Sequence, residues 1–131
     1  MPKTPAIRLV NARPAPDRAA VLTKAVIRAA DLLGFKDVEL AQIVGVSAPT
    51  VSRCRRGEAE IDPARKAGEL ALLLVRLFRS LDPLVGADAE KRKAWMRTEN
   101  TALGDVPAML VRNPEGLVQT LAYLDGMRAL A

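Results

Sequence analysis

The chain has 131 residues, half of them hydrophobic, and a formal net charge of +5, which is enough for one or two small globular domains with a buried core. It contains one cysteine, Cys54, and no histidine, which excludes a disulfide framework, a Cys/His zinc site and histidine-based acid–base catalysis. We therefore expect neither a metal nor another cofactor, and an enzyme is the least favoured class of protein.

Residues 1–16 contain four prolines and little hydrophobic periodicity, so we expect a flexible N-terminal arm. The same stretch carries charges in place of a long apolar run, so neither a secretory signal nor a membrane span is predicted. The cytoplasm is the expected location, with no membrane partner.

The first predicted helix covers residues 18–33. Asp17 is a capping residue before it, and Gly34 ends it. Its apolar residues recur at spacings of three and four, as an amphipathic helix requires; they are Leu22, Ala25, Val26, Ala29, Leu32 and Leu33.

The stretch Asp37 to Arg56 has the spacing of two short helices joined by a tight turn. Ala41 is small enough for the helices to approach where they cross, and Gly45 can take the positive φ that the turn needs. Ser47 can cap the second helix, and Val51 would point inward. This pattern predicts a helix-turn-helix within a domain that covers residues 17–81.

The outer face of the second helix fits the major groove of double-stranded DNA. Ala48 and Pro49 lie on that face but donate no side-chain hydrogen bond, so a single copy would read sequence weakly and a dimer or larger assembly is expected. We expect phosphate contacts from Arg55 and Lys36. The side chains expected to read base edges are Ser47, Thr50, Ser52, Arg53 and Arg56.

After a short acidic loop, Asp62-Pro63 predicts the start of a long leucine-rich helix. Its leucines exceed what one small bundle needs, so an extra apolar face is expected to meet another subunit or the C-terminal region. Asp82-Pro83 ends this helix, and a second domain is predicted over residues 82–131.

Three further helices are predicted in the second domain. In the first, over 89–98, Lys91, Arg92 and Lys93 face outward, with Trp95 and Met96 inside. The second runs from Pro107 to about Val111, and the last from Leu117 to Leu130, after a break at Asn113-Pro114 and Gly116. No strand pattern appears anywhere in the sequence, so the predicted fold class is all-α.

The excess of positive charge lies in the first half. Through Lys66 there are 12 Lys and Arg against 7 Asp and Glu, whereas from Ala67 onward there are 8 of each. A basic half beside a neutral half is typical of a chain that binds phosphates with one part and a different partner with the other.

The second half resembles the C-terminal domain of Xre/ParS-type antitoxins, the partners of RES-domain toxins. The resemblance covers roughly residue 81 to the end and rests on Trp95, Asn100, Leu103-Gly104, Pro107, Leu110, Gly116, Val118, Leu121 and Gly126. It implies that the C-terminal domain binds and inhibits a cognate RES toxin that degrades NAD, while the N-terminal domain binds the promoter of its own operon. The expected toxin-binding residues are Trp95, Asn100, Leu117, Leu121, Tyr123, Leu124, Met127 and Arg128.

Two other functions remain open at this point. The first is a stand-alone helix-turn-helix transcriptional regulator whose C-terminal domain dimerises or senses a ligand. The second is an interaction protein whose helix-turn-helix has lost DNA binding.

Overall fold

A computed structural model describes residues 17–130, so the predicted N-terminal arm lies outside the described residues. The described part is all-α, as predicted, with seven α-helices and one 3₁₀-helix. The elements are α2 (Arg18–Leu33), α3 (Asp37–Val44), α4 (Ala48–Arg55), α5 (Lys66–Leu81), η1 (Asp82–Val85), α6 (Ala89–Arg97), α7 (Pro107–Leu110) and α8 (Pro114–Leu130). None of these helices is long and apolar enough to cross a membrane.

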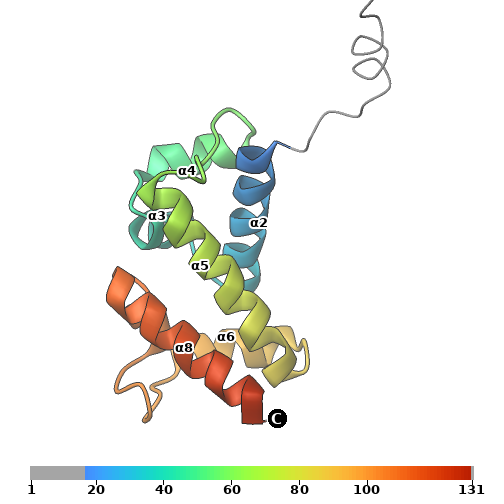
Figure 1. The fold of residues 1–131 in the computed structure, drawn as a ribbon, viewed down its shortest axis with the longest axis vertical. Coiled ribbons are helices and arrows are strands. Elements are labelled where there is room, and N and C mark those ends of the chain that lie inside the picture. Colours follow the sequence, from blue (N-terminus) through green and yellow to red (C-terminus); the bar gives the residue numbers. More distant parts are fainter. Residues whose placement is uncertain (1–16, 131) are drawn as a thin grey trace, which may run out of the picture.

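Helix α5 is the central element, and both halves of the chain pack on it. It contacts α2 and α3 along one side and α8 along another (Figure 1). The extra apolar face of α5 was expected to meet either another subunit or the C-terminal region. In the structure it packs on α8 of the C-terminal region, which explains the excess of leucines in α5. Helices α4 and α8 lie towards opposite ends of the long axis of the described part (Figure 1).

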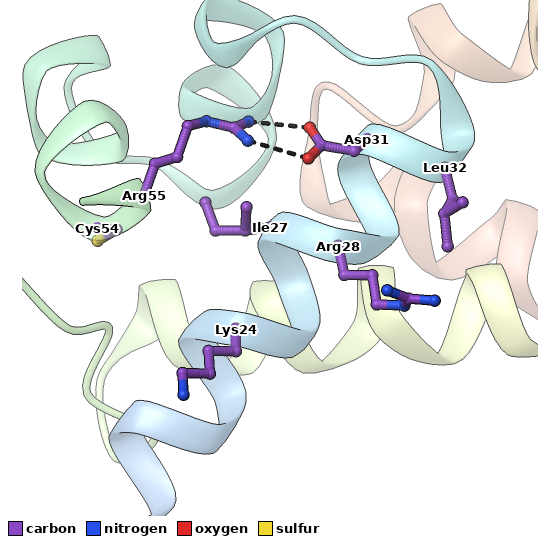
Figure 2. A pocket seen from close by; sticks show the side chains of 7 residues that line it. All are labelled: Lys24, Ile27, Arg28, Asp31, Leu32, Cys54 and Arg55. Carbon is purple, nitrogen blue, oxygen red and sulfur yellow. Dashed lines mark hydrogen bonds and ion pairs between the residues drawn. The ribbon is translucent and has the colours of Figure 1, made fainter. Parts of the chain in front are cut away.

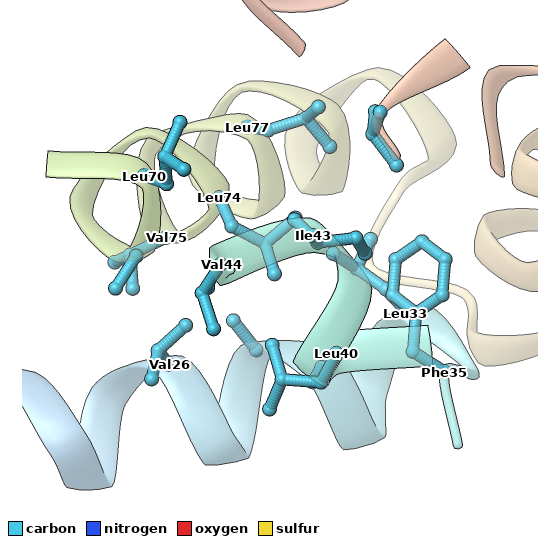
Figure 3. Close-up of a cluster of buried hydrophobic side chains, with 14 of the residues drawn as sticks. Val26, Leu33, Phe35, Leu40, Ile43, Val44, Leu70, Leu74, Val75 and Leu77 are labelled. Carbon is cyan, nitrogen blue, oxygen red and sulfur yellow. The ribbon is translucent and has the colours of Figure 1, made fainter. Parts of the chain in front are cut away.

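The buried apolar side chains form one continuous cluster. Figure 3 shows side chains of α2, α3 and α5 that converge, among them Val26, Leu40 and Leu74. The cluster continues to Met96 of α6 and Leu117 of α8, both fully buried. The core does not end at Leu81, so the two predicted domains share one hydrophobic core. The domain boundary between residues 81 and 82 therefore stays a prediction.

The helix-turn-helix forms as predicted. Gly45 has φ +78 and its N–H donates to the Ala41 carbonyl, while Ala41 and Val51 are buried. Ser47 Oγ accepts the Thr50 N–H at 3.2 Å, which caps α4. Local sequence signals therefore determine this turn, because glycine adopts left-handed backbone without the steric cost of a Cβ atom.

The prediction that Asp62-Pro63 begins the long helix was wrong, since α5 begins at Lys66. Asp62 Oδ1 instead accepts the Ala64 N–H at 2.9 Å within a turn that precedes the helix. This turn lies directly against Gly68, where a Cβ atom would overlap the Asp62 carbonyl oxygen. Close packing of the turn on α5 thus overrides the helix-start signal of the dipeptide.

The predicted break between the last two helices is present, but it ends at Asn113 and does not extend to Gly116, because α8 begins at Pro114 and not at Leu117. Asn113 Oδ1 accepts the Gly116 N–H at 2.8 Å, so the asparagine caps a helix whose first residue is proline. A Cβ atom at Gly116 would overlap the Leu110 carbonyl oxygen. The glycine is needed for the close approach of α7 to α8, and it does not end a helix.

Arg92, predicted to face outward, is buried in the interface that joins α6 to α2 and α5. Its guanidinium donates to Asp82 Oδ1 at 2.9 and 3.0 Å and to the Leu32 carbonyl at 3.1 Å. It also lies 5.4 Å from the centroid of the Phe78 ring. These contacts compensate the burial of the charge, which explains why a cation occupies an interior position.

Candidate functional site

Three of the predicted base-reading residues form a connected row along the exposed side of α4. Ser47 Oγ and Thr50 Oγ1 are 2.8 Å apart, and Arg53 Nη2 donates to Thr50 Oγ1 at 3.1 Å. The spacing of three residues brings these side chains onto neighbouring turns of one face. The row orients the Arg53 guanidinium before any partner arrives.

Arg56 and Ser52 complete the predicted face. Arg56 forms an ion pair with Glu58, with Nε and Oε2 3.2 Å apart and both side chains 56% exposed. An exposed pair of this kind contributes little stability, so a phosphate or a base edge can replace Glu58 at small cost. Ser52 is half-buried at the same face.

Arg55, which the sequence predicted to contact phosphate, pairs with two carboxylates of the chain itself. It makes two 2.9 Å hydrogen bonds to the Asp31 carboxylate and a third, of 2.7 Å, to Asp37 Oδ1 (Figure 2). Hydrogen bonds from Arg55 hold the pKa of Asp31 below its ordinary value, and the carboxylates raise the pKa of Arg55 further. Its guanidinium is thus occupied in fixing α4 to α2 and α3.

Cys54 also lies in α4, but its side chain is buried against the core. Burial raises the pKa of its thiol, so the reactive thiolate is disfavoured at neutral pH. The cysteine therefore acts as a small apolar side chain, and the described site contains no activated nucleophile at this position.

The predicted toxin-binding residues of α8 divide into two groups. Leu117, Leu121 and Leu124 are buried in the core, where they hold α8 on α5, so the chain itself covers their side chains in this structure. Met127 and Arg128 are exposed, and Tyr123 is half-buried. Val118 was among the residues of the family resemblance but not among the expected toxin-binding residues, and 51% of its surface is exposed.

Trp95 and Asn100 line one shallow cavity of about 390 Å³, together with Val85, Ala94 and Thr98. Trp95, predicted inside, is only half-buried. Asn100 also shapes the following turn, because its Oδ1 accepts the Leu103 N–H at 3.1 Å and its carbonyl accepts the Gly104 N–H at 2.8 Å. The structure thus brings these two residues together, with part of the indole ring accessible.

A cluster that sequence reasoning missed joins the helix-turn-helix to the C-terminal half. Glu39 of α3 accepts two 2.9 Å hydrogen bonds from Arg97 of α6 and one of 3.1 Å from Arg112, which precedes α8. Its Oε1 also accepts the Lys36 N–H at 2.8 Å. We call Glu39, Arg97 and Arg112 the Glu39 cluster.

The Glu39 carboxylate is held in its ionised form. Its side chain is only 13% exposed, and hydrogen bonds from Arg97, followed by smaller effects of Lys36 and Arg112, lower its pKa to about 2. Arg97 also donates to the Gly34 carbonyl and stacks on Phe35, 5.3 Å from the ring centroid. The two halves of the chain are therefore connected by charge as well as by the core.

The two halves match the models of two protein families. Residues 12–76 match the antitoxin Xre-like helix-turn-helix domain, and residues 80–129 match the antitoxin Xre/MbcA/ParS C-terminal toxin-binding domain. No curated protein matches the chain. Both families are domains of antitoxins, and they assign a helix-turn-helix and a toxin-binding domain to successive parts of one chain.

Proposed function

The chain belongs to the Xre/MbcA/ParS antitoxins, and on that premise we propose that it inhibits a RES-type NAD-degrading toxin and represses its own operon. The observation that carries this proposal is the presence of both family domains in one chain, with α4 and α8 towards opposite ends of the fold (Figure 1). Such an arrangement lets one chain hold a toxin without covering its DNA-binding face.

On the DNA side, we propose that α4 enters the major groove of the operator. In the row of Ser47, Thr50 and Arg53, the two hydroxyl groups are 2.8 Å apart and the guanidinium lies 3.1 Å from the Thr50 hydroxyl. Arg53 and Arg56 are the candidates for bidentate pairing with guanine, the commonest specific contact in the major groove. Because operator DNA lies in the cytoplasm, we propose that the chain acts there.

On the toxin side, we propose a surface that combines the exposed flanks of α8 with the cavity at Trp95 and Asn100. Val118 and Met127 are 51% and 41% exposed and lie on opposite flanks of α8, since nine residues correspond to two and a half turns. Arg128 is exposed near the C-terminal end of α8, where its Nη1 donates to Ser80 Oγ at 3.4 Å. Methionine and aromatic side chains are enriched at protein interfaces because they bury large apolar areas and adapt to a partner. Covering the toxin active site with this surface would block NAD degradation.

We further propose that the antitoxin acts as a homodimer or within a larger assembly with the toxin. The outer face of α4 contains Ala48 and Pro49, which donate no side-chain hydrogen bonds, so one copy makes few base contacts. Two copies on repeated half-sites would add their contacts, as helix-turn-helix dimers do.

The direct test measures NAD consumption by a purified RES-domain toxin, which is the proposed partner. Adding the purified chain should abolish consumption at a stoichiometric ratio, and a matched amount of heat-denatured chain should not. Undiminished NAD consumption in the presence of the folded chain would reject the antitoxin role towards this toxin. If the same preparation still bound its upstream DNA, a stand-alone transcriptional regulator would be the better account.

A further inference from the structure

A hollow of about 330 Å³ lies where α2 meets the C-terminal part of α4. Residues of α2 form most of its wall, and two consecutive residues of α4 form the rest (Figure 2). The lining residues are Lys24, Ile27, Arg28, Asp31, Leu32, Cys54 and Arg55. We call it the α2–α4 hollow.

The α2–α4 hollow carries an excess of positive charge. Its only carboxylate, Asp31, is taken by the two hydrogen bonds from Arg55. Lys24 and Arg28 are exposed, and within residues 17–130 no ion pair involves either of them. Figure 2 shows both side chains directed away from the Asp31 carboxylate. Two cations are therefore left without an internal counter-charge.

The position of these cations on one helix is itself unfavourable without a partner. Lys24 and Arg28 are four residues apart on α2, which places them on one face and separates them by about 6 Å along the axis. Like charges at this spacing destabilise a helix. An anion bound across the pair would remove the repulsion.

We propose that the α2–α4 hollow binds backbone phosphate of the DNA strand that borders the groove entered by α4. The major groove is only about 12 Å wide, so a helix inside it has phosphates on either side, within reach of a neighbouring helix. The bonds of Arg55 to Asp31 fix α2 relative to α4, so a phosphate held by Lys24 and Arg28 sets the position of α4 in the groove. This inference rests on the proposed DNA binding of α4.

The test compares a double variant in the hollow, Lys24→Ala with Arg28→Ala, with a matched control on distant helices, Arg79→Ala with Lys91→Ala. Both pairs remove one lysine and one arginine from exposed helical positions. Affinity is measured by fluorescence anisotropy on two duplexes, the region immediately upstream of the gene and an unrelated sequence of equal length. Titrations run from about 50 to about 200 mM salt, because each phosphate contact contributes about 0.9 to the salt slope. Circular dichroism checks that every variant is folded.

The hollow variant should weaken binding to both duplexes by a similar factor and lower the salt slope by about 2, while the control variant leaves the slope unchanged. A hollow variant with the wild-type affinity and slope would overturn the inference and leave the DNA-binding role intact. Equal losses in the hollow and control variants would also overturn it, since net charge alone would then explain the effect. If the wild-type chain binds neither duplex even at low salt, the proposed DNA-binding function itself fails.

Discussion

Replacing Glu39 by glutamine removes the charge at the centre of the Glu39 cluster while it preserves the size of the side chain. The ionised carboxylate has a pKa of about 2 in the folded protein against an ordinary value of 4.5. At about 1.4 kcal/mol per pKa unit, the difference of about 2.5 units corresponds to about 3 kcal/mol of stability at neutral pH. Because the side chain is only 13% exposed, solvent screening reduces this value little.

The pH dependence follows from the direction of the shift. A pKa lowered on folding stabilises the native state above the unfolded value of 4.5, and the contribution declines as the pH falls from 4.5 towards 2. Glu39→Gln should therefore lower the free energy of unfolding by about 3 kcal/mol at pH 7 and by less than half as much at about pH 3. Urea unfolding followed by circular dichroism at both pH values measures the two differences.

Glu58→Gln is the matched control, because Glu58 also pairs with an arginine but both side chains are 56% exposed. Its cost should stay below about 1 kcal/mol at either pH. The stabilising role of the Glu39 charge is refuted if Glu39→Gln lowers the free energy of unfolding no more than this control does at pH 7. A cost that is the same at both pH values would also contradict it, since the loss would then not arise from the charge.

Three further substitutions test separate parts of the account. Arg53→Ala should weaken binding to upstream DNA by about 1 to 3 kcal/mol in gel shift, with inhibition of the toxin unchanged; equal loss of both activities would argue against separate surfaces. Met127→Asp should weaken toxin inhibition about tenfold or more in a titration of NAD consumption, with the thermal midpoint and DNA affinity retained. Leu124→Ala, which opens a cavity under α8, should cost about 2 to 5 kcal/mol in urea unfolding, and a near-neutral result would contradict its burial.

The parts of the fold that depend only on residues close together in the sequence could be predicted from the sequence. Gly45 and Ser47 determine the turn and the start of α4 through their own backbone and side-chain preferences, and the structure shows both as predicted. Arg92 could not be placed in this way, because its burial depends on Asp82 and on the Leu32 carbonyl, 60 residues earlier in the chain.

The candidate site was predictable only in part for the same reason. The apolar stripe of Leu117, Leu121 and Leu124 indicates a buried face but does not tell whether α5 or a toxin covers it, and in the structure α5 does. In the sequence, Arg55 cannot be told apart from Arg53 and Arg56, the other two arginines near the end of α4. Its partners Asp31 and Asp37 come from other helices. Pairings between distant charges leave no local pattern in the sequence.

The central claim is that DNA and toxin bind to separate surfaces of one chain. It is tested most directly by adding saturating toxin to the preformed complex of the chain with upstream DNA and measuring the mass of the product by light scattering. If the two surfaces are separate, a ternary complex forms that contains DNA, antitoxin and toxin, and NAD consumption stays blocked. Release of the DNA in proportion to the toxin bound, at several salt concentrations, would contradict it.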